Sequence, residues 1–170
     1  SPFNFPLNLV AHKIAPALAA GNTILLKPAP KTPLTALLLA EIIASVGVPD
    51  GAVSVFLCGN ELAEKMVLDP QVKMLSFTGS AAVGWMLKKK ANKKRVVLEL
   101  GGNAGVIIHS DADLDYAAKR CAIGGFSYAG QVCISVQRIF VQEQIYSRFS
   151  SLFAEQVRGL QVGDPTDEKT

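Results

Sequence analysis

The segment GFSYAGQVCISVQRIFV, residues 125–141, places a cysteine where a loop is expected to lead into a strand. A thiolate is a strong nucleophile and can carry an acyl group as a thioester. Free cysteine is also among the most buried residue types, so a place in the core is the default interpretation of Cys133. The other polar residues of the chain must decide between nucleophile and core residue.

Two further side chains could take part in acyl chemistry. Glu99 lies in the apolar segment LELGG, residues 98–102. It is either an exposed position of a strand or a carboxylate in apolar surroundings, where it would be a better proton acceptor near neutral pH. Asn4 lies among apolar neighbours in SPFNFP. It is either a turn residue or the donor of an amide N–H to an anion.

Two segments could bind a nucleotide. In SFTGSAAVG, Gly79 and Ser80 end an expected strand and precede an expected helix, whose free N–H groups could hold a phosphate. The segment lacks the G-x-G-x-x-G fingerprint, so a tight strand-to-helix turn explains it equally well in isolation. In LLKPAP, Lys27 ends another strand, at the sheet edge where open α/β folds bind nucleotides. A solvated lysine is the alternative.

Helical and strand patterns alternate along the chain, which predicts β-α-β units with parallel strands and right-handed crossovers. Asp111 or Asp113 is expected to cap the fifth helix. The pattern restarts after Gly101-Gly102, which predicts two partial domains, 1–102 and 103–170. The helices are expected at 7–20, 34–47, 61–69, 81–91, 111–127 and 145–160, and the strands at 23–27, 52–59, 72–80, 95–102, 104–110 and 136–142.

Composition excludes several classes of protein. Of the 170 residues, 49% are hydrophobic, but no unbroken apolar run reaches the roughly 18 residues of a membrane span, and no signal peptide is recognisable. The lysine-rich run 88–95 contains no aromatic residue, which favours a solvated helix end over a nucleic-acid site. Neither a membrane, a nucleic acid nor a metal is expected as a partner.

Three widely spaced cysteines, Cys58, Cys121 and Cys133, argue against a disulfide framework and favour a reducing, cytoplasmic setting. The chain opens on SPFNFP without a preceding strand and ends on the polar GDPTDEKT. We therefore expect it to be part of a longer protein.

Five segments in order, SPFNFP, LLKPAP, FTGS, LELGGN and GQVC, closely resemble the signature segments of the NAD(P)-dependent aldehyde dehydrogenase superfamily. The resemblance runs the whole length of the chain and covers the middle of a family member. It implies an α/β fold, with a Rossmann-like parallel sheet in a partial dinucleotide-binding domain, 1–102, followed by the start of a second α/β catalytic domain, 103–170. It also implies a small-molecule aldehyde as substrate, NAD or NADP as cofactor, and a homo-oligomeric full-length protein.

The resemblance assigns roles to individual residues. Cys133 would attack the aldehyde to give a thiohemiacetal and, after hydride transfer, a thioester. Asn4, together with the backbone N–H of Cys133, would form the oxyanion hole, and Glu99 would activate the water that hydrolyses the thioester. Lys27 would bind the adenosine ribose, and Gly79 and Ser80 would lie against the pyrophosphate. The full set of implied cofactor contacts is Lys27, Pro28, Gly59, Gly79, Ser80 and Val83.

The chain differs from the usual family pattern at two positions, and both concern cofactor binding. Many relatives that use NAD have a glutamate where this chain has Pro30, followed by Lys31. No carboxylate is therefore expected there to hold a 2′-hydroxyl or to repel a 2′-phosphate, and the preference between NAD and NADP stays open. The segment around Gly59 lacks a second glycine common in that turn, which leaves its phosphate contact open.

Three alternatives remain at this point. A CoA-acylating aldehyde dehydrogenase would transfer the acyl group to CoA, but such relatives usually lack the glutamate base, so Glu99 favours water. A Cys–His hydrolase would need His12 or His109 beside the thiol. The third alternative is an inactive fragment that only binds nucleotide, because half of a two-domain cleft holds ligands weakly. The sequence does not identify the aldehyde.

Overall fold

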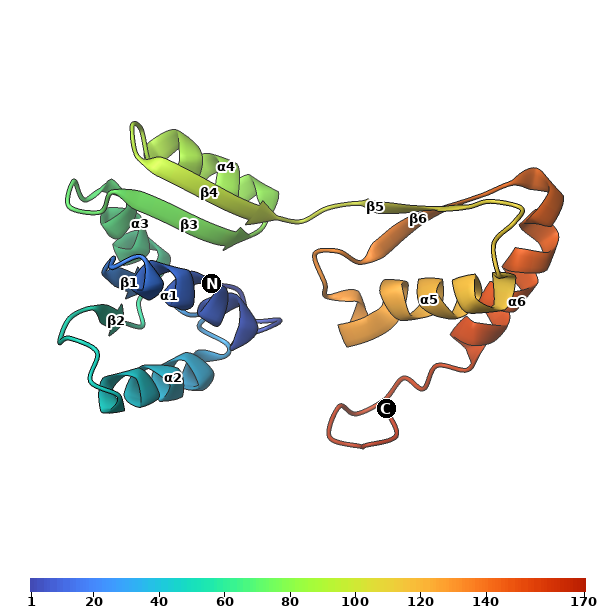
Figure 1. Cartoon of the computed structure of the whole chain (residues 1–170), viewed down its shortest axis with the longest axis horizontal. Helices are drawn as coiled ribbons and strands as arrows, with labels where there is room; N and C mark the ends of the chain where they lie inside the picture. The colour runs from blue at the N-terminus through green and yellow to red at the C-terminus, as the bar shows by residue number, and fades with distance from the viewer. The chain divides into compact units, whose positions relative to one another are not determined.

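The structure is a computed structural model that describes all residues, 1–170. It divides into two compact units, Ser1–Gly101 and Gly102–Thr170. Strands and helices alternate along each unit, as Figure 1 shows. The α/β class predicted from the sequence is confirmed, and the strands pair in parallel throughout. None of the helices combines the length and the apolar composition needed to cross a membrane.

The first unit contains two parallel strand pairs, β1–β2 and β3–β4. Each pair forms its own two-stranded sheet. The elements are α1 (Asn8–Ala19), β1 (Ile24–Leu26), α2 (Pro33–Ser45), β2 (Val53–Val55), α3 (Asn60–Leu68), β3 (Met74–Gly79), α4 (Ala81–Lys90) and β4 (Arg95–Leu100).

One core of this unit lies where α1 and α2 pack against β1. Its buried residues are Val10, Ile14, Leu26 and Ala36. The chain leaves α1 through Gly21, whose φ of 69° is accessible to glycine without steric cost. The N–H of Asn22 then donates to the carbonyl of Ala17 at 2.8 Å, the bond that closes a Schellman motif. Helix α1 therefore ends where the Gly21-Asn22 pair predicted.

The strand pair β3–β4 carries helix α4, and a glycine allows the two to approach. A Cβ on Gly84, in the first turn of α4, would clash with the side chain of Leu100. Gly84 is therefore required by helix–strand packing, in addition to any role in the turn. The lysine-rich run ends α4, and its lysines are exposed apart from Lys94, which is half-buried. Lys90 pairs with Glu64 at 2.6 Å, and Lys94 donates to the carbonyl of Val67 in the last turn of α3.

The second unit is built on one parallel pair, β5–β6. Its core contains Ile108, Leu114, Ala118, Cys121 and Phe149, which join β5 to the two long helices. The elements are β5 (Ala104–Ile108), α5 (Leu114–Phe126), the 3-10 turn η1 (Ser127–Gly130), β6 (Val136–Val141), the 3-10 turn η2 (Glu143–Ile145) and α6 (Tyr146–Arg158).

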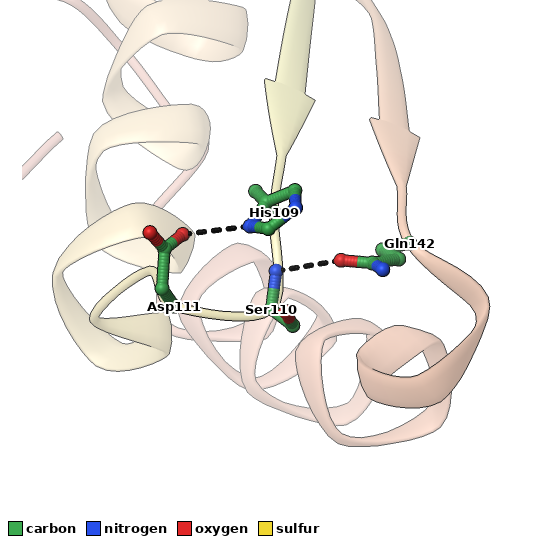
Figure 2. Close-up of polar contacts among 4 residues, drawn as sticks. All are labelled: His109, Ser110, Asp111 and Gln142. Atoms are coloured by element: carbon green, nitrogen blue, oxygen red, sulfur yellow. Dashed lines mark hydrogen bonds and ion pairs between the residues drawn. The ribbon is translucent and has the colours of Figure 1, made fainter.

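The loop between β5 and α5 shows which aspartate caps the helix. The carboxylate of Asp113 accepts from the N–H of Tyr116 at 3.1 Å. Asp111 instead accepts from Nδ1 of His109 at 2.9 Å, and this bond and the charge of the imidazole lower the pKa of Asp111. Figure 2 shows that pair beside the bond from the N–H of Ser110 to the side-chain oxygen of Gln142.

We expect Asp113→Ala to loosen the first turn of α5. The loss of such a cap costs about 0.5–2 kcal/mol, which corresponds to roughly two- to thirtyfold faster exchange for the amide of Tyr116. Hydrogen exchange of the full-length protein, read on the peptide that contains residues 113–118, measures the effect. Asp111→Ala is the matched control, because its exposed pair with His109 contributes little. Equal acceleration in both variants would contradict the assignment of the cap.

Candidate active site

The three cysteines differ in exposure. Cys133 lies between η1 and β6 and is exposed, whereas Cys58 is half-buried and Cys121 is buried in the core of the second unit. Burial raises the pKa of the Cys121 thiol, which makes it a poor nucleophile. The default interpretation of cysteine as a core residue therefore fits Cys121, and it is wrong for Cys133.

Glu99 lies on β4, directly across the parallel pair from Thr78 on β3. Successive residues of β4 alternate between exposed and half-buried, and Glu99 is on the exposed face with Val97. Within the first unit this carboxylate is at an exposed strand position. The first unit by itself does not provide the apolar surroundings considered from the sequence.

Lys13 is a candidate site residue that the sequence analysis did not identify. Its ammonium reaches from α1 to β3 and donates to the hydroxyls of Ser76 and Thr78, each at 2.9 Å. Burial lowers the pKa of Lys13, and the nearby carboxylate of Glu99 opposes that shift. The sequence does carry one signal for this residue, because Lys13 is a charged residue within the apolar helical pattern of residues 7–20.

Asn4 is half-buried and precedes α1 by a short turn, in which the N–H of Leu9 donates to the carbonyl of Phe5 at 3.0 Å. Asn4 and Glu99 belong to the first unit and Cys133 to the second. The structure thus distributes the three implied catalytic residues over both units, with the amide and the carboxylate in one and the thiol in the other.

The residues implied to bind the cofactor follow the strand ends of the first unit. Lys27 is half-buried just after β1, and Pro28 is buried beside it. Ser80 follows β3 and caps α4, because its hydroxyl accepts from the N–H of Val83 at 3.4 Å. A lysine and the free N–H groups of a helix start form a donor set that fits an anionic dinucleotide.

The glycines among these residues differ in whether neighbouring side chains leave room for a Cβ. Gly79 ends β3, and a Cβ there would lie 2.7 Å from the ring of Phe77, so the backbone passes close to that side chain. Gly59 is the N-cap of α3, and nothing lies within 4 Å of a Cβ built on it. A side chain at position 79 would therefore displace the ring of Phe77, whereas position 59 has room for one.

The segment after Lys27 is exposed at Pro30 and Lys31. The ammonium of Lys31 lies 5.5 Å from the ring centroid of Phe3, which is a cation–π contact. This contact holds a positive charge next to the position where many NAD-using relatives have a carboxylate.

The two histidines have surroundings that differ from those of a catalytic imidazole in a Cys–His hydrolase. His12 is exposed on α1 and belongs to the first unit, whereas Cys133 belongs to the second. His109 lies in the same unit as the thiol, and its Nδ1 bonds to Asp111 two residues along the chain (Figure 2).

Comparison with known proteins finds aldehyde dehydrogenases that are similar over the whole chain. The chain is 48% identical over 171 residues to 3-sulfolactaldehyde dehydrogenase from Priestia aryabhattai, with 100% of this chain and 36% of that protein covered. Two solved structures superpose on it. One is glyceraldehyde-3-phosphate dehydrogenase from Methanocaldococcus jannaschii complexed with NADP, with 46% identity, a TM-score of 0.94, and coverage of 100% of this chain and 38% of that one. The other is an NAD-dependent benzaldehyde dehydrogenase from Corynebacterium glutamicum, with 40% identity, a TM-score of 0.92, and the same coverage.

The chain spans about a third of the length of the curated relatives it matches. The family model for the aldehyde dehydrogenase family matches residues 1–170, which is every residue of the chain. The chain therefore belongs to the aldehyde dehydrogenase family.

Proposed function

We propose that the full-length protein oxidises a small-molecule aldehyde to a carboxylic acid with NAD+ or NADP+. The observation that carries the proposal is the exposed thiol of Cys133 in a chain that matches the family over its whole length. The direct test is formation of reduced nicotinamide by the full-length protein with a panel of aldehydes. If no aldehyde in a broad panel gave reduced cofactor, the proposal would be wrong.

The first half of the reaction builds the thioester. The Cys133 thiolate attacks the carbonyl carbon, a C–S bond forms, and the carbonyl electron pair moves onto oxygen. The side-chain amide of Asn4 and the backbone N–H of Cys133 donate to this oxyanion. A nicotinamide cofactor, when bound, would supply the acceptor for the hydride that leaves the same carbon. The C=O bond forms again, and the acyl group remains on sulfur.

The second half releases the acid. The carboxylate of Glu99 takes a proton from water as the water oxygen attacks the thioester. The C–S bond breaks, the thiolate leaves, and the net change is aldehyde, oxidised cofactor and water to acid, reduced cofactor and a proton. Lys13 lies close enough to Glu99 for the carboxylate to oppose the lowering of the lysine pKa by burial, so the two groups share one side of the first unit.

The cofactor is assigned to the domain 1–102 and the thiol to the domain 103–170. In this proposal Lys27 binds the adenosine ribose, Pro28 shapes its surroundings, and Gly79, Ser80 and Val83 hold the pyrophosphate at the start of α4. The donor set described above supports the assignment, as do the NADP-bound and NAD-dependent relatives. Gly59 is the cofactor contact with the least structural support, because nothing lies within 4 Å of a Cβ built there.

We expect the unmodified full-length enzyme to use both cofactors, with NAD+ as the default. Pro30→Glu should lower kcat/KM for NADP+ about tenfold or more, because a new carboxylate repels the 2′-phosphate, and tenfold corresponds to about 1.4 kcal/mol. Steady-state kinetics with both cofactors measure the change. Pro30→Gln is the uncharged control and should keep NADP+ activity. An unmodified enzyme that rejects NADP+ as strongly as the Pro30→Glu variant would contradict the prediction.

Compartment and assembly belong to the same proposal. Three free cysteines, one of them exposed, support a reducing, cytoplasmic compartment, where a nucleophilic thiol persists. Assembly of the full-length protein as a homo-oligomer is implied by the family resemblance, and sedimentation of that protein measures it.

A further inference from the structure

The segment that connects α5 to β6 contains Cys133 and begins with an unusual backbone. Tyr128, Ala129 and Gly130 have φ values of 55°, 53° and 72°, three left-handed residues in succession. The left-handed conformation is unfavourable for residues other than glycine. Such residues keep this conformation only where contacts with the surrounding structure hold them in it. Contacts at the end of this segment therefore help to hold it.

Ser135 holds the end that follows the cysteine. It is only 4% exposed. Its hydroxyl donates to the carbonyl of Gly125 at 3.2 Å and accepts from the side-chain amide of Gln137 at 3.1 Å. Gly125 lies in the last turn of α5, where carbonyls lack a partner within the helix. A buried hydroxyl thus joins the segment after Cys133 to the helix before it.

The same serine closes the turn that contains the thiol. The N–H of Ser135 donates to the carbonyl of Val132 at 3.0 Å, so Cys133 is the second residue of a four-residue turn. The carbonyl of Cys133 lies 3.4 Å from the position that a Cβ on Gly102 would take. The direction of the Cys133 N–H and thiol is therefore set by a turn whose last residue is anchored.

Two features of the surroundings favour this anchor. The register of β5 and β6 runs from Ala104–Val136 to Gly105–Arg138, so Gln137 is the extra residue of a β-bulge, and its side chain bonds to Ser135. A Cβ on Gly124 would lie 2.8 Å from Val136, so a small residue lets the start of β6 come close to α5.

We propose that Ser135 is a positioning residue for Cys133: its buried hydroxyl, bonded to Gly125 and Gln137, fixes the turn that places the thiol and its N–H. Ser135 does not touch the substrate in this proposal and acts only through the backbone of the turn. The inference rests on the proposed function, because it assigns Cys133 the nucleophile and oxyanion roles.

The experiment mixes full-length Ser135→Ala rapidly with aldehyde and saturating NAD+ and follows reduced cofactor in the first turnover. The amplitude of the burst counts active sites, and its rate constant reports their geometry. We expect the rate constant per active site to fall about 10- to 100-fold, the loss typical of a misplacement near 1 Å. Ser135→Thr retains the hydroxyl and should recover most of the rate constant.

Ser151→Ala is the matched control. It also removes a serine hydroxyl that donates to a backbone carbonyl, that of Ser147 at 3.0 Å, but on the exposed side of α6. It should keep the native burst. A Ser135→Ala enzyme with a native rate constant would overturn the inference, whether or not its amplitude is reduced, because a lower amplitude alone reports fewer folded molecules.

Should Ser135→Ala fail to fold, Gln137→Ala decides the question. It removes the donor to the Ser135 hydroxyl and leaves the bond to Gly125, so we expect a smaller loss, about threefold, in the same rate constant. A native rate constant in Gln137→Ala would then overturn the inference. Failure of the proposed function gives a different result, namely no reduced cofactor from the unmodified enzyme with any aldehyde, and it would remove the inference as well.

Discussion

Cys133→Ala is expected to abolish aldehyde oxidation by the full-length protein, with a loss in kcat of about 10⁴-fold or more, as for the removal of other catalytic nucleophiles. Without the thiol no C–S bond forms, so neither the thiohemiacetal nor the thioester is available for hydride transfer. Steady-state formation of reduced cofactor measures the loss. Mass spectrometry after brief treatment with iodoacetamide should find the label first on Cys133, the exposed thiol of the three.

The other two cysteines provide the controls. Cys58→Ala and Cys121→Ala should retain turnover. Cys121→Ala changes the core of the second unit, so its free energy of unfolding is expected to fall while its kcat per folded molecule stays near native. Equal loss of turnover in all three variants would indicate a folding defect and would contradict the assignment of the nucleophile.

Glu99→Gln is expected to separate acylation from deacylation. The amide keeps the shape of the side chain but cannot accept the proton of the attacking water, so the thioester should form and then persist. Rapid mixing of the full-length variant with aldehyde and saturating NAD+ should give a burst of NADH close to the enzyme concentration. Very slow turnover should follow, about 10²-fold or more below the native rate.

Two results would contradict this role of Glu99. Unchanged steady-state hydrolysis in Glu99→Gln would leave the residue structural, which its exposed strand position in the first unit also allows. Acceleration of the unmodified enzyme by added CoA would identify CoA as the acyl acceptor and move the protein to the acylating class. Glu61→Gln, a change at an exposed residue in the first turn of α3, is the matched control and should show no persistent burst.

Much of the fold could be predicted because its signals are local. The boundaries of α1, α4 and α6 lie within two residues of the predicted ones. The alternation of helix and strand periods is set by neighbouring residues, and it is enough to predict parallel pairs. The pairing partners of the individual strands were not predicted. Hydrogen bonds between strands depend on residues far apart in sequence, and β2 and β3 proved to belong to separate pairs.

The candidate site divides in the same way. By itself the sequence determined the order of the five signature segments, and with them the family and the identity of Cys133, Glu99 and Asn4 as candidates.

Only the tertiary structure decided that Cys133 is exposed while Cys121 is buried, because exposure depends on which helices pack over a residue. It likewise assigned the cap to Asp113, since the carboxylate of Asp111 is held by His109. The bond from Ser135 to Gly125 has no sequence signature, because its geometry exists only after α5 and β6 have packed together.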